Sequence, residues 1–67
     1  MCYSKRLHST VYNGRPAVEV YDCLDRLQTT LVNIFPGTSM LRFMQIVAED
    51  YYGLHIIFLR GQDAYLD

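Results

Sequence analysis

The clearest hydrophobic pattern in the chain runs through residues 20–34. Five apolar residues recur there at alternating steps of four and three positions: Val20, Leu24, Leu27, Leu31 and Ile34. This spacing is the period of one face of an α-helix. Acidic residues crowd the start of the segment, where the helix dipole favours them, and Pro36-Gly37 is a typical helix end. The pattern therefore predicts an amphipathic helix over residues 17–35.

The residues before this helix favour extended backbone followed by a turn. Thr10-Val11-Tyr12 is rich in strand-forming residues, and Asn13-Gly14 is a strong turn signal. A hairpin that returns through residues 15–18 is one interpretation. However, Pro16 cannot donate a hydrogen bond in a strand ladder, and it suits the first turn of a helix. We therefore expect a strand, a turn and then the helix.

The second half of the chain is less decisive. Read as a helix capped by Ser39, residues 40–49 align Met40, Leu41, Met44, Val47 and Ala48 on one face. Read as a strand, they alternate, and short apolar runs do not decide between the two by period alone. Residues 54–60 have the branched and aromatic composition of a strand, and residues 49–53 suit a polar hairpin loop with a glycine. We therefore expect a strand–loop–strand hairpin that ends near Gly61.

The expected order of elements is strand, helix, strand, strand. It predicts an α+β fold with a single amphipathic helix packed on a small, mainly antiparallel three-stranded sheet. The chain has 67 residues, of which 51% are hydrophobic and 19% charged, so the composition is globular rather than disordered. At this length we expect one domain over residues 1–67, with a core small enough to need support from a partner.

The last hairpin holds more apolar surface than one helix can cover. In the final strand, Leu54, Ile56 and Phe58 point one way, whereas His55, Ile57 and Leu59 point the other. The second face of an antiparallel sheet is normally polar. We therefore expect this face, or an edge of the sheet, to form a homodimer or to bind another protein. The alternative is that the N-terminal segment folds over that face.

The chain also has six tyrosines, and it has one lysine against five arginines, a bias typical of protein interfaces. Two adjacent tyrosines beside Gly53 cannot both be buried in a small hairpin, so at least one is expected to anchor a partner. The expected function is that of a small regulator, inhibitor or complex subunit that acts by steric or scaffolding contacts. The expected partner-binding residues are Tyr51, Tyr52, His55, Ile57 and Leu59.

Nucleic-acid binding is the rival hypothesis. Cations that hold phosphates and rings that stack on bases are the components of single-strand binding sites. The N-terminal third of the chain offers such a set, in Lys5, Arg6, Arg15, Tyr3 and Tyr12. Three firm positive charges are few, and the formal net charge of −1 gives no general attraction to nucleic acid.

Neither catalytic nor metal-binding spacing is evident in the sequence. Cys2, His8, Cys23 and His55 are not arranged in paired ligand motifs, and the glycines resemble turn residues rather than a phosphate-binding loop. We therefore expect a protein that is not an enzyme and that holds no cofactor or metal. No signal peptide or membrane-spanning run is present, which favours the cytoplasm with both thiols reduced.

Overall fold

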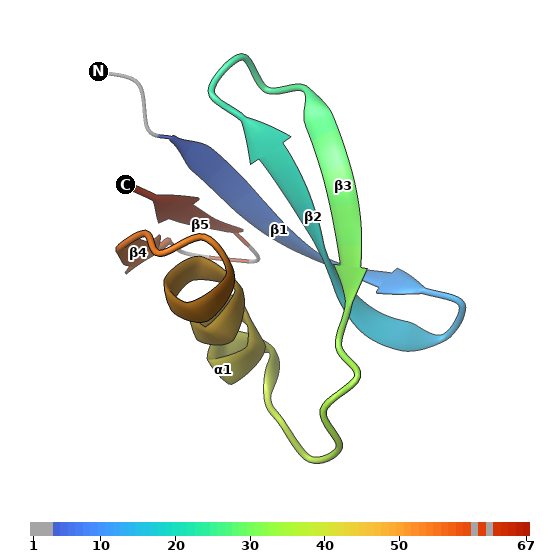
Figure 1. Cartoon of the computed structure of the whole chain (residues 1–67). Helices are drawn as coiled ribbons and strands as arrows, with labels where there is room; N and C mark the ends of the chain where they lie inside the picture. Colours follow the sequence, from blue (N-terminus) through green and yellow to red (C-terminus); the bar gives the residue numbers. More distant parts are fainter. Residues whose placement is uncertain (1–3, 60, 62) are drawn as a thin grey trace.

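The computed structural model describes residues 4–59, 61 and 63–67, and it shows one twisted antiparallel sheet with a helical segment against it (Figure 1). The sheet has five strands in the order β3-β2-β1-β5-β4. The α+β class is confirmed, whereas the expected count of three strands is wrong. The elements along the chain are β1 (Lys5–Tyr12), β2 (Arg15–Asp22), β3 (Leu27–Val32), α1 (Met40–Gln45), the π-helical segment η1 (Ile46–Tyr51), β4 (Ile56–Phe58) and β5 (Asp63–Leu66).

The first turn of the chain is a tight β-hairpin. Asn13 and Gly14 have φ angles of 51° and 74°, which is the type I′ geometry that matches the twist of paired strands. Tyr12 lies opposite Arg15, and the pairing continues to Lys5 opposite Asp22. The expected turn is confirmed, but the expected helix after it is wrong, because the chain returns as β2.

Pro16 fits this strand because its missing N–H is not needed by β1. In β2, residues alternate between hydrogen bonds to β1 and hydrogen bonds to β3. The Asn33 N–H donates to the Pro16 carbonyl at 2.8 Å, so the backbone of Pro16 points toward the end of β3. The lost donor therefore falls just beyond Val32, the last residue of β3, where the ladder ends.

The helix predicted over residues 17–35 is instead β2, a loop and β3. Val18 and Val20 are fully buried on one face of β2, with the period of two that a strand requires. Three members of the apparent helical stripe are exposed, with 67% of Leu24, 54% of Leu27 and 69% of Ile34 accessible to solvent. The four-three spacing of these residues was coincidental.

The helical segment of the molecule is α1 followed directly by η1, where we expected a strand. The Ser39 hydroxyl caps α1 by accepting a hydrogen bond from the Arg42 N–H at 3.2 Å. Phe43, Met44, Val47 and Ala48 are buried along the segment. The helical interpretation of residues 40–49 is therefore the right one, and residues 49–51 continue η1 rather than form a hairpin loop.

The last strands form a hairpin of their own. Of the strand expected over residues 54–60, the structure has β4 over Ile56–Phe58, and Arg60 lies outside the described residues; β5 was not expected. Ala64 and Leu66 of β5 are buried opposite Leu7 and Lys5 of β1. This pairing places β4 at one margin of the sheet and β3 at the other.

The hydrophobic core lies between α1–η1 and one face of the sheet (Figure 1). Sheet residues that face the helix meet its buried side chains. Each fully buried Val, Leu, Ile, Phe or Met side chain contributes roughly 1.5–3 kcal/mol. The buried cluster comprises Leu7, Val18, Val20, Phe43, Met44, Val47, Ala48, Ile56, Ala64 and Leu66. The opposite face of the sheet is left without a covering element among the described residues.

Candidate functional site

The margin of the sheet formed by β4 exposes a run of consecutive apolar side chains. Ile57, Phe58 and Leu59 are consecutive, and 46%, 40% and 38% of their surfaces are accessible to solvent. No charged residue occurs from Leu54 to Leu59. Natural sheet margins are usually protected from pairing by charges, prolines or bulges. We call Ile56, Ile57, Phe58 and Leu59 the β4 edge.

The backbone of the β4 edge is also open to pairing. His55 and Asp67 exchange two backbone hydrogen bonds, of 3.0 and 2.8 Å, and the Leu59 N–H donates to the Asp63 carbonyl at 3.1 Å. Because antiparallel pairing alternates, the N–H and C=O groups of Ile56 and Phe58 point away from β5. No described strand lies on that side. The β4 edge therefore presents both backbone and apolar side chains to solvent.

The other expected partner-binding residues all precede this edge in the sequence. His55 is exposed and precedes β4, and its backbone pairs with Asp67. Tyr51 is 67% exposed at the end of η1, whereas Tyr52 is half-buried. The two rings meet edge to face with centroids 4.8 Å apart. Burial of Tyr52, with a smaller effect from Tyr51, raises the pKa of the Tyr52 hydroxyl.

The uncovered face of the sheet is polar at its centre. The Arg6 guanidinium contacts Asp25 Oδ1 at 2.6 Å and Asp63 Oδ2 at 3.2 Å, and His8 Nδ1 lies 2.5 Å from Asp63 Oδ1. Arg6 also stacks over the Tyr21 ring at 4.3 Å. These contacts join β1, β5 and the loop after β2. The expectation of an apolar second face does not hold for this central region, where charged side chains are paired with one another.

A hydrogen bond on the same face raises the pKa of Tyr21. The Tyr21 hydroxyl donates to Glu19 Oε1 at 3.0 Å, and this bond raises the pKa of Tyr21. Glu19 lies opposite His8 in the pairing of β1 with β2. The face therefore carries both signs of charge, in side chains that contact one another.

The basic residues of the rival hypothesis are divided by the fold. Lys5 lies on the helix side of β1, where its Nζ donates to Gln28 Oε1 at 2.8 Å and sits 4.9 Å from the Tyr52 ring centroid. Arg6 projects to the opposite face, into the contacts with Asp25 and Asp63. Tyr12 and Arg15 are brought together as the pair that closes the first hairpin. Tyr3 lies outside the described residues, as does Cys2, and nucleic-acid contact stays a prediction.

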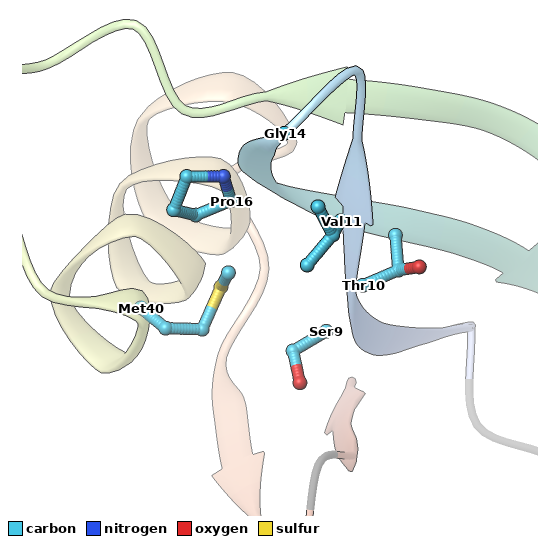
Figure 2. Close-up of a pocket in the computed structure, with 6 residues that line it drawn as sticks. All are labelled: Ser9, Thr10, Val11, Gly14, Pro16 and Met40. Carbon is cyan, nitrogen blue, oxygen red and sulfur yellow. The ribbon is translucent and has the colours of Figure 1, made fainter.

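Two hollows that the sequence did not reveal flank Pro16. One has a volume of about 320 Å³ and is lined by Ser9, Thr10, Val11, Gly14, Pro16 and Met40. Figure 2 shows Met40 at the start of α1 extending toward this hairpin. The second, which we call the β3-end hollow, has a volume of about 360 Å³ and is lined by Arg15, Pro16 and residues 33–38. The one local indication of this hollow is the apolar pair Ile34-Phe35 before Pro36, which the sequence pattern assigned to the predicted helix.

Comparisons of the chain with protein-family models, curated proteins and solved structures found no match. Within residues 4–59, 61 and 63–67, no three His, Cys, Asp or Glu side chains are grouped as a metal site would require. In the same part of the chain, no helix is long and apolar enough to cross a membrane.

Proposed function

We propose that this chain is a small protein-binding module that self-associates through the β4 edge. It acts by steric contact, as a regulator, an inhibitor or a small subunit of a larger complex, in the cytoplasm. One observation carries the proposal: an uncharged outer strand exposes three consecutive apolar side chains together with unpaired backbone groups. A strand of this kind is a template for pairing with another chain.

The backbone geometry selects one mode of self-association. In an antiparallel pair of two β4 strands, the outward groups of Ile56 and Phe58 bond to Phe58 and Ile56 of a second copy. This register forms four hydrogen bonds and sets the two Ile57 residues directly opposite each other. The two sheets then join into one continuous sheet, and a two-fold axis makes the interface self-complementary. Tyr51 and His55 remain exposed for a further partner.

A charge placed on the β4 edge tests this function. We expect the unmodified chain to have a molar mass above 7.8 kDa, approaching twice that value as concentration rises. Ile57→Lys is expected to return it to a monomer, because each interface would then bury two opposing ammonium groups. The measurement is size-exclusion chromatography with light scattering over a concentration series.

Thr29→Lys is the matched control, since it adds the same charge to an exposed position on β3, the opposite margin of the sheet. It should leave the molar mass unchanged. A monomeric unmodified chain at the highest attainable concentration would contradict self-association. Equal loss of mass in both variants would show that net charge, rather than the β4 edge, controls it.

A further inference from the structure

The β3-end hollow is built from two segments that the fold holds in fixed positions. Arg15 and Pro16 come from the start of β2, and residues 33–38 connect β3 to α1. Three hydrogen bonds shape the connection: Phe35 N–H to Asn33 Oδ1 at 3.0 Å, Asn33 Nδ2 to the Thr38 carbonyl at 3.1 Å, and Thr38 N–H to the Phe35 carbonyl at 3.3 Å. The hollow is therefore preformed rather than shaped by a ligand.

The apolar wall of the hollow is anchored to the core. The Phe35 ring packs against the buried Phe43 ring, with centroids 6.4 Å apart and planes inclined at 55°. Phe35 is nonetheless 44% exposed, and Ile34 beside it is 69% exposed. These side chains, with Pro16 and Pro36, offer an apolar surface that can receive an aliphatic or aromatic group.

The charge at this hollow is unbalanced. Arg6 and Arg26 form ion pairs with aspartates elsewhere, whereas Arg15 is exposed and forms no ion pair with a described residue. No carboxylate is found among the described residues that line the hollow. A cation at the rim of an apolar hollow is complementary to an apolar side chain next to a carboxylate.

The outer margin of β3 leads directly to this hollow. Because Asn33 bonds to Pro16, the alternation of the ladder directs the N–H and C=O groups of Thr30 and Val32 away from β2. No described strand lies on that side, and Leu27–Val32 contains no charge or proline. The lining of the hollow begins at Asn33, the next residue after β3.

We propose that the β3 margin and the β3-end hollow together bind an extended acidic peptide. The peptide adds to the sheet antiparallel to β3 and places an apolar side chain in the hollow and the neighbouring carboxylate on Arg15. Neighbouring side chains of the bound peptide strand point to opposite faces of the sheet. Arg15 and Pro16 are consecutive in β2, so they also lie on opposite faces and can each receive one of the two. This inference extends the proposed function, because it assigns a second partner to the margin opposite the β4 edge.

A pair of synthetic peptides tests the proposal. The probe is the capped peptide acetyl-Leu-Glu-Val-Thr-Val-Thr-amide, and its matched control has Lys in place of Glu. We expect the Glu peptide to shift the backbone amide resonances of residues 30–38 in ¹H–¹⁵N spectra of the full chain. We expect it to bind about tenfold more tightly than the Lys peptide, because the exchange replaces attraction to Arg15 by repulsion.

Variants separate charge recognition from general stickiness. Arg15→Glu should reverse the preference in favour of the Lys peptide, and Ile34→Ser should weaken binding of both peptides. Arg42→Glu makes the same change of charge at an exposed position of α1 outside the lining, and it should preserve the preference for Glu. Both Ile34 and Arg15 are exposed, so these variants are expected to fold.

The two proposals fail separately. Ile57→Lys should abolish self-association and bind the Glu peptide as the unmodified chain does. Absence of shifts at residues 30–38, or equal affinity for the two peptides, would overturn the peptide site whatever the oligomeric state. Shifts centred on β4 instead would assign peptide binding to the β4 edge and would equally overturn this site.

Discussion

At the scale of single residues, Asp22 holds the connection between β2 and β3 together. Its Oδ1 atom accepts hydrogen bonds from the Leu24 and Arg26 N–H groups, both at 2.9 Å. Its Oδ2 atom accepts a bond from Arg26 Nε, also at 2.9 Å. The backbone bond from Arg26, supported by the Arg26 side chain and the Leu24 N–H, lowers the pKa of Asp22. These contacts close the loop in which Asp25 has a φ of 64°.

The lowered pKa of Asp22 predicts a pH-dependent contribution to stability. A carboxyl whose pKa is lower in the folded than in the unfolded chain stabilises the fold at pH values above its unfolded pKa, which is about 4. That contribution is lost as the pH falls through the folded pKa. Asp22→Asn should therefore lower the urea midpoint at pH 7, and the difference from the unmodified chain should shrink in acid. Urea titrations of both chains at pH 7 and in acid measure the midpoints. A difference between the midpoints that does not change with pH would contradict the assignment to the ionised carboxylate.

The residues of the first turn show where sequence reasoning succeeded and where it failed. Asn13-Gly14 predicts a tight turn because both residues accept positive φ, and the structure has it. Pro16, judged by its local sequence, argues against a hairpin, yet the structure has one. A proline disrupts a strand only where its missing N–H would have bonded to a neighbouring strand. Whether it would do so depends on which neighbouring strand the backbone faces at that position. That information comes from the position of β3, which the local sequence does not contain.

At the scale of elements, the failed helix and the missed helix have the same origin. In residues 20–34 a helical period arose from side chains that prove to be exposed, such as Leu24 and Ile34. In residues 40–48 the helical and alternating patterns were both present, and tertiary packing selected the helix. A sheet of five strands needs a cover for its apolar face, and α1–η1 provides that cover. Period alone does not show which of two segments the core requires.

Packing of α1 on the sheet predicts a contrast between two neighbouring residues. Phe43 is 4% exposed in the core, whereas Leu41 is 62% exposed. Phe43→Ala should lower the free energy of unfolding by about 3 kcal/mol, through lost burial and the cavity it leaves. Leu41→Ala should change it by less than about 0.5 kcal/mol. Urea unfolding followed by circular dichroism measures both, and equal effects would show that α1 does not pack as described.

At the scale of the whole molecule, topology created the surfaces that matter. The α+β class, the strand at β4 and the exposure of at least one residue of the Tyr51-Tyr52 pair were expected from the sequence. An outward face of the last strand that carries His55, Ile57 and Leu59 was expected as well. The strand order was not, because β5 is a short DAYL segment whose insertion between β1 and β4 depends on long-range pairing. The β3-end hollow was missed for the same reason: it joins Arg15 to residues 33–38, which a helix would have separated.

Cross-linking of Ile57→Cys tests the central claim most directly. In the proposed pairing, the two residues 57 form a non-hydrogen-bonded pair with Cα atoms about 4.5 Å apart, which lies within the range that a disulfide spans. The substitution is made with Cys2→Ser and Cys23→Ser, so that one thiol remains, and Thr29→Cys in the same background is the control. Under mild oxidation, we predict that the Ile57→Cys chain forms a covalent dimer much faster than the Thr29→Cys chain. Equal rates of dimer formation by the two chains would contradict self-association through the β4 edge.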